Sequence, residues 1–126
     1  MSEKRILMCI DDDPAWVDIV REEAVRAGRT DLDFVSADNL VAARDLIRTN
    51  AGRAAAVVTN LSLIGQNGTE GLEIAILAVA EGVTAVAINT ARPFDLVERP
   101  EGVVVLNKQK DDSPDGTLYN FLATAA

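Results

Sequence analysis

Five polar residues of the kinds that handle metal ions and phosphoryl groups each follow a short apolar run of this chain. They are two carboxylates, an amide, a hydroxyl and an ammonium, at Asp11, Asp12, Asn60, Thr90 and Lys108. Adjacent carboxylates beside a backbone carbonyl group are typical of a Mg²⁺ site, because this ion prefers a few hard oxygen ligands. A hydroxyl and an ammonium nearby would suit the oxygens of a phosphoryl group. We therefore expect these side chains to form one site.

The apolar runs that precede these residues predict buried strands separated by helices. The predicted strands are Arg5–Ile10, Leu32–Ala37, Ala54–Thr59, Thr84–Thr90 and Val103–Asn107. Strands that alternate with helices indicate an α/β fold with a doubly wound, five-stranded parallel sheet. In such sheets ligands bind beyond the carboxyl ends of the strands, which is where the five polar residues lie.

Capping residues predict where the helices begin and end. Asp13 is a good N-cap, Pro14 suits the first helical position, and Gly28 ends the first helix. Asp38 is expected to cap the second helix. The third and last helices are expected at about Leu72–Ala80 and about Thr117–Ala125. Trp16 should pack on the flank of the first helix, about one turn beyond the carboxylates.

Length and composition limit the function classes that are open to the chain. Its 126 residues predict a single domain over 1–126. A net charge of −8 argues against direct binding of nucleic acid, which requires a basic surface. No apolar stretch is long enough to span a membrane. The single cysteine, Cys9, lies in an apolar run and favours a reducing cytoplasm, and the absence of histidine excludes histidine-based catalysis.

Four short motifs, in order along nearly the whole chain, give it a resemblance to a known family. They are "LMCIDDDP" at the first strand, "NLSL" after the third, Thr90–Ala91 after the fourth and Lys108 after the fifth. In this arrangement the sequence resembles the receiver domain of bacterial two-component response regulators. The resemblance implies a flavodoxin-like (βα)5 fold with strand order 2-1-3-4-5.

The resemblance also implies a role for each residue that matches a family motif. Asp11 and Asp12 would bind Mg²⁺, and Ser62 would offer its backbone carbonyl group to the same ion. Thr90 would be the hydroxyl that follows a phosphoryl group. Lys108 would pair with the acceptor carboxylate and the phosphoryl oxygens. Asn60 holds the position of the phosphorylated aspartate.

The sequence departs from the family at several of these positions. Asn60 carries an amide, which is a poor nucleophile, so no ordinary acyl phosphate can form there and Mg²⁺ binding should weaken. We expect Lys108, which lacks its usual partner, to turn toward Asp12. Val105 stands where the family has its switch aromatic residue, and Gln109 replaces a proline. The segment between the fourth and fifth strands is short, which should truncate the fourth helix.

These departures favour a pseudo-receiver, a receiver-like domain that is not phosphorylated at Asn60 and acts through protein–protein contact. It would be cytoplasmic and bacterial, would not be an enzyme, and would have a histidine kinase or a downstream signalling protein as partner. One alternative is a phosphorylatable receiver domain whose acceptor aspartate was changed to Asn60 in the laboratory. Another is a flavodoxin-like enzyme or small-ligand binder. The sequence leaves the oligomeric state open.

Overall fold

The computed structural model describes residues 4–61, 70–91, 100–108 and 117–125. Five parallel strands form one sheet in the order β2-β1-β3-β4-β5. The strands are β1 (Arg5–Ile10), β2 (Leu32–Ala37), β3 (Ala54–Thr59), β4 (Val86–Thr90) and β5 (Val103–Asn107). The predicted fold class and strand order are therefore confirmed.

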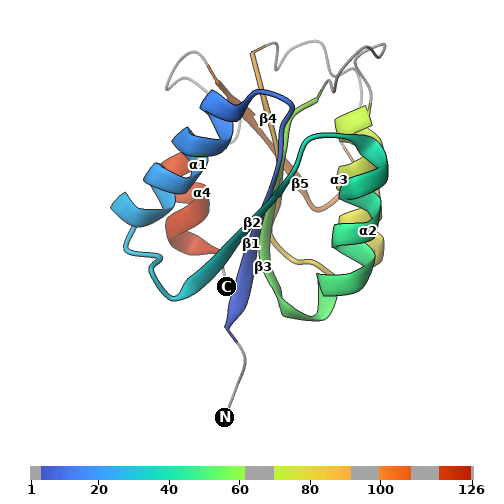
Figure 1. Cartoon of the computed structure of the whole chain (residues 1–126), viewed down its shortest axis with the longest axis horizontal. Helices are drawn as coiled ribbons and strands as arrows, with labels where there is room; N and C mark the ends of the chain where they lie inside the picture. Colours follow the sequence, from blue (N-terminus) through green and yellow to red (C-terminus); the bar gives the residue numbers. More distant parts are fainter. Residues whose placement is uncertain (1–3, 62–69, 92–99, 109–116, 126) are drawn as a thin grey trace.

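Helices cover both faces of the sheet, so that the molecule has three layers (Figure 1). The helices are α1 (Pro14–Arg26), α2 (Leu40–Asn50), α3 (Glu70–Ala80), α4 (Leu118–Thr124) and the short 3₁₀ helix η1 (Ala51–Arg53). The helices α1 and α4 lie together on one face, and α2 and α3 lie on the other. None of the helices in the described ranges is long and apolar enough to cross a membrane.

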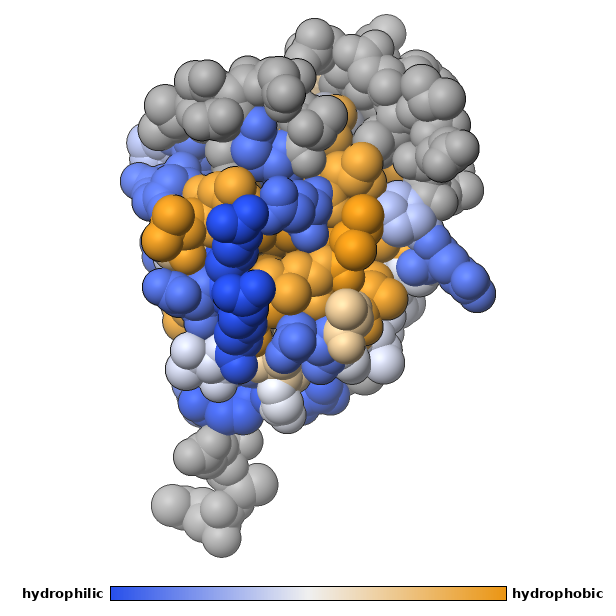
Figure 2. Space-filling model, turned by 90° about the vertical axis from the view of Figure 1, so that its right-hand side faces the viewer, coloured by the Kyte–Doolittle hydropathy of each residue, from blue (hydrophilic) through white to orange (hydrophobic). Residues whose placement is uncertain are grey.

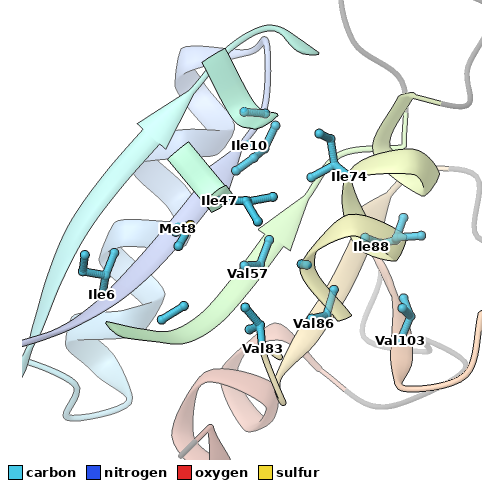
Figure 3. Packing of buried hydrophobic residues seen from close by; sticks show 14 of the residues in the cluster. Ile6, Met8, Ile10, Ile47, Val57, Ile74, Val83, Val86, Ile88 and Val103 are labelled. Atoms are coloured by element: carbon cyan, nitrogen blue, oxygen red, sulfur yellow. The ribbon is translucent and has the colours of Figure 1, made fainter. Parts of the chain in front are cut away.

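Alternation along the strands divides the apolar core into two clusters. On the α2/α3 side, Met8, Val57 and Ile88 belong to a cluster that is filled mainly by aliphatic side chains (Figure 3). On the α1/α4 side, Leu7 and Cys9 pack with Leu122. Strands that are buried on both faces are typical of parallel sheets. The rigid centre of the sheet fixes where each strand ends.

Most predicted element boundaries are confirmed, including Asp13 as the N-cap of α1 and the end of that helix before Gly28. The predicted cap of α2 is wrong. The side chain of Asn39, rather than that of Asp38, accepts a hydrogen bond from the Ala42 amide at 2.9 Å. The Asp38 carboxylate instead accepts a hydrogen bond from the Asn39 side chain.

Two other boundaries differ from the sequence prediction. Strand β4 begins at Val86 rather than Thr84, after a turn at Gly82 whose φ is 94°. Helix α3 begins at Glu70, two residues earlier than predicted, and the Gly71 amide donates to the Leu61 carbonyl oxygen at 2.9 Å. This contact provides a partner outside the helix for one of its first amides, which have none within it.

The surface over α2 and α3 is partly apolar. Figure 2 shows apolar side chains gathered on this side of the molecule next to strongly hydrophilic ones. The large apolar side chains that are exposed here are Val41 on α2 and Ile76 on α3. Between the two helices, Arg44 forms an ion pair with Glu73.

Candidate functional site at the carboxyl ends of the strands

Backbone hydrogen bonds extend the sheet by one residue at three of the strand ends. The Asp11 amide donates to Ala37 O at 3.0 Å, the Asn60 amide to Ile10 O at 2.8 Å, and the Lys108 amide to Thr90 O at 2.9 Å. The backbones of Asp11, Asn60 and Lys108 therefore hold their positions relative to neighbouring strands. The sequence prediction that these strand ends meet at one edge of the sheet agrees with this arrangement.

Asp11 and Lys108 form a buried ion pair. The Lys108 Nζ atom lies 2.7 Å from Asp11 Oδ2, and the two side chains are only 8% and 4% exposed. Burial raises the pKa of the Asp11 carboxyl above its ordinary value, although the hydrogen bond from Lys108 opposes this shift. Removal of a carboxylate from water favours its neutral form. The lysine ammonium therefore compensates the negative charge of Asp11, which is almost completely buried.

The expectation that Lys108 turns toward Asp12 is wrong. Asp11 continues the alternation of Leu7 and Cys9 toward the α1/α4 side, where the lysine reaches it. Asp12 has a different partner, because the Asn60 side-chain amide donates to Asp12 Oδ1 at 3.3 Å. The amide at the acceptor position therefore binds one carboxylate of the pair, and the lysine binds the other.

Asp13 and Thr90 complete the described part of the site. The Asp13 amide donates to Asp11 Oδ1 at 3.0 Å, so that the first turn of α1 helps to orient the buried carboxylate. Thr90 is buried at the end of β4 and is joined to Lys108 through the backbone. The phosphoryl-binding role of the Thr90 hydroxyl stays a prediction. Ser62 and Gln109 lie outside the described residues.

In this arrangement the Asp11 carboxylate is not available to a Mg²⁺ ion. The Lys108 ammonium engages one oxygen of Asp11, and the Asp13 amide engages the other. Within the described ranges, no group of three or more acidic or cysteine side chains is placed to hold a metal ion. A divalent ion that bound through Asp11 would have to displace the lysine, so the Mg²⁺ site stays a prediction.

An open hollow borders the two carboxylates on the β2 side. Its volume is about 480 Å³, and its lining includes Asp11, Asp12, Asp18 and Asp38. Four carboxylates around one space repel phosphate and nucleotide anions. For the alternative of a flavodoxin-like enzyme or small-ligand binder, the hollow therefore disfavours ligands that carry phosphate.

Two polar or aromatic features near the site were not assigned to it from the sequence. The half-buried Trp16 ring, which was predicted to pack on the flank of α1 about one turn beyond Asp12, has its centroid 4.9 Å from Lys108 Nζ. Asn89 in β4 is 2% exposed, and its Nδ2 atom has no hydrogen-bond partner in the described part of the chain. An asparagine inside an otherwise apolar strand was the available signal for Asn89. For Trp16 the signal was its distance of one turn from Asp12.

Comparisons with known proteins agree with this fold. No family model and no curated protein matches the chain. A receiver domain of a response regulator from Clostridium thermocellum superposes with a TM-score of 0.52 and 17% identity, over 68% of this chain and 64% of that one. The receiver domain of the hybrid histidine kinase CckA superposes with a TM-score of 0.57 and 20% identity, over 83% and 86% of the two chains. The chain has the fold of receiver domains.

Proposed function

We propose that this chain is a receiver-like domain of two-component signalling that acts by protein–protein contact, without phosphorylation at residue 60. The observation that carries the proposal is the Asn60 side chain at the end of β3, which donates to Asp12 where a receiver would present a nucleophilic carboxylate. An amide cannot form an acyl phosphate in the ordinary way. The chain is then a binding module and not an enzyme.

The state of the neighbouring charges supports the same proposal. Lys108 is already paired with Asp11, so its ammonium is engaged before any phosphoryl group arrives. Mg²⁺ would bind weakly, because it would have to compete with this lysine and would lack a third carboxylate. The arrangement therefore favours a site in which Asp11, and not a phosphoryl group, compensates the charge of Lys108.

The partner in this proposal is a protein, either a histidine kinase or a downstream signalling protein. The exposed Val41 and Ile76 side chains provide apolar surface for such a contact. The net charge of −8 favours a partner with a basic patch and disfavours nucleic acid.

One observation favours a second candidate, a phosphorylatable receiver domain in which Asn60 replaces the natural aspartate. Asp11, Asp12, Thr90 and Lys108 all stand at the strand ends that the family uses. In that case only the acceptor would be missing, and restoring it would restore the reaction.

The decisive experiment is intact-mass measurement of the Asn60→Asp variant after incubation with acetyl phosphate, with and without Mg²⁺. The unaltered protein and Asn60→Ala serve as controls that lack a carboxylate. Our proposal predicts that the folded Asn60→Asp variant gains no phosphoryl group and that the unaltered protein keeps its mass.

Each other outcome would change the conclusion. A Mg²⁺-dependent gain of one phosphoryl group in Asn60→Asp would favour the phosphorylatable receiver domain. A gain in the unaltered protein that maps to residue 60 would contradict the statement that Asn60 blocks the reaction. A gain in Asn60→Ala as well would place the modification elsewhere in the chain.

A further inference from the structure

The Lys108 ammonium has an aromatic neighbour as well as an anionic one. Its Nζ atom lies 2.7 Å from Asp11 Oδ2 and 4.9 Å from the centroid of the Trp16 ring. The lysine side chain is 8% exposed, so that water provides little of its solvation. A buried ammonium is stable only if other groups replace the lost water. The face of an indole is the best aromatic surface for this purpose.

The start of α1 fixes the ring and the carboxylate relative to each other. Asp13 caps the helix, and its carbonyl oxygen accepts a hydrogen bond from the Trp16 amide at 3.0 Å. The Asp13 amide donates to the Asp11 carboxylate. Trp16 and Asp11 therefore belong to one short, hydrogen-bonded segment. This segment contacts Lys108, which follows β5, through the Asp11 carboxylate and the Trp16 ring.

We infer that Trp16 is a positioning residue that, together with Asp11, holds the Lys108 ammonium against the start of α1. The lysine then keeps one position although residue 60 carries no carboxylate. This inference does not rest on the proposed function, because it concerns the lysine in the chain as it stands. It assigns to Trp16 a role that packing on a helix flank would not require.

Proton NMR tests the contact directly, because an aromatic ring shifts the resonances of protons that lie over its face. We expect the ε-methylene protons of Lys108 to resonate clearly upfield of those of Lys4. Trp16→Leu should abolish this difference, and Trp16→Phe should retain part of it. Phe34→Leu is the matched control, since it removes a ring that stacks on a different cation, Arg21, at 4.7 Å.

The rate at which Lys108 is acylated tests the positioning role. Leucine and phenylalanine are both apolar and of similar size, but only phenylalanine offers a π-face. We expect Trp16→Leu to accelerate acylation of Lys108 about tenfold, equivalent to about 1.4 kcal/mol, as measured by peptide mass spectrometry. Trp16→Phe should stay near the native rate, and Phe34→Leu should not change it.

Two results would overturn the inference. One is a native Lys108 ε-methylene resonance at the position of an exposed lysine. The other is equal acylation rates in Trp16→Leu and Trp16→Phe. If Trp16→Leu fails to fold, the comparison between the native protein and Trp16→Phe decides, because a phenyl ring must give a smaller upfield shift than an indole. An unchanged shift in that variant would contradict the contact.

Discussion

Burial makes it costly to remove either charged group of the ion pair between Asp11 and Lys108. Both side chains are almost completely removed from solvent, so deletion of one leaves the other charge without compensation. This differs from the pair between Arg44 and Glu73, whose side chains are 37% and 51% exposed. Exposed pairs contribute little because water already solvates both partners.

We predict that Lys108→Met and Asp11→Asn each lower the free energy of unfolding by about 3–5 kcal/mol. The double substitution should lower it by less than the sum of the two, because no unpaired charge remains buried. Urea titration of the three variants gives all the values. Glu73→Gln, the control, should lower stability by less than about 1 kcal/mol. Additive effects at positions 11 and 108 would contradict the buried pair.

The buried Cys9 thiol makes the free energy of unfolding depend on pH. Burial, with a smaller contribution from the Asp11 carboxylate, raises the pKa of the Cys9 thiol from 9.0 to about 12. The unfolded chain therefore loses this proton first as the pH rises. The stability that the protonated thiol contributes is fully present below pH 9.0 and is lost as the pH rises toward 12.

We predict that, above pH 9.0, the free energy of unfolding of the native protein falls relative to that of Cys9→Ala. The difference should grow by about 1.4 kcal/mol per pH unit, since one unit of pKa shift corresponds to that energy. Chemical unfolding of both proteins between pH 8 and about 11 measures it. Parallel stability curves would show that the thiol ionises equally in both states.

Sequence could predict the members of the site but not their pairing. The apolar runs predict strands that end just before Asp11, Asn60 and Lys108, and Asp12 follows Asp11. These residues are therefore expected at one edge of the sheet. Which carboxylate the lysine binds depends on side-chain direction, because Asp11 continues toward the α1/α4 side while the Asn60 amide occupies Asp12. Alternation along β1 gives the direction of Asp11, but the sequence alone does not show on which side of the sheet Lys108 reaches a carboxylate.

At the scale of elements, the join between β3 and α3 depends on one glycine. A Cβ atom on Gly71 would lie 1.7 Å from the carbonyl oxygen of Asn60 and 2.7 Å from Leu61 Cα. Both atoms belong to the backbone and cannot rotate away. The helix can approach the strand end at residue 60 only because residue 71 has no side chain.

We predict that Gly71→Ala lowers the free energy of unfolding by about 1–3 kcal/mol or more, because the start of α3 must move away from the strand. It should also shift the amide resonances of Asn60. Gly52→Ala is the matched control, since a Cβ there meets nothing within 4 Å, and its effect should stay within about 0.5 kcal/mol. Urea titration and heteronuclear NMR test both variants. An unchanged Asn60 spectrum in Gly71→Ala would contradict the close approach.

Element boundaries were predictable where a single residue type decides them. Pro14 after Asp13 fixes the start of α1, and both lie as expected. At α2 two good capping residues, Asp38 and Asn39, stand side by side, and sequence preference does not separate them. Helix α3 starts early because the Leu61 carbonyl oxygen accepts from Gly71, a tertiary contact that helix propensity does not report.

At the scale of the whole molecule, Arg29 ties the end of α1 to the last helix. Its side chain is 13% exposed and donates to the backbone oxygens of Leu122 and Ala125, the first of these at 3.0 Å. It also pairs with Asp31. Helix α4 has only seven residues and depends on such tertiary contacts for its stability.

We predict that Arg29→Ala lowers the free energy of unfolding by about 1.5–3 kcal/mol, because two partly buried carbonyl groups lose a charged donor. Amide hydrogen exchange should accelerate most in α4. Arg48→Ala on the exposed surface of α2 is the control and should leave that exchange unchanged. Equal exchange in α4 of native and Arg29→Ala protein would show that the helix is held by its apolar face alone.

Because a ribosome makes the chain from the N-terminus, the Asp11–Lys108 pair affects folding during translation. The two residues are 97 positions apart, so Asp11 emerges long before its counter-charge exists. A nascent chain that ends before β5 can align β1, β2 and β3, but any burial of Asp11 at that stage lacks the compensating charge of Lys108. Burial of that carboxylate thus opposes premature closure of the sheet during translation. The arrival of Lys108 makes completion of β5 the event that stabilises the end of β1.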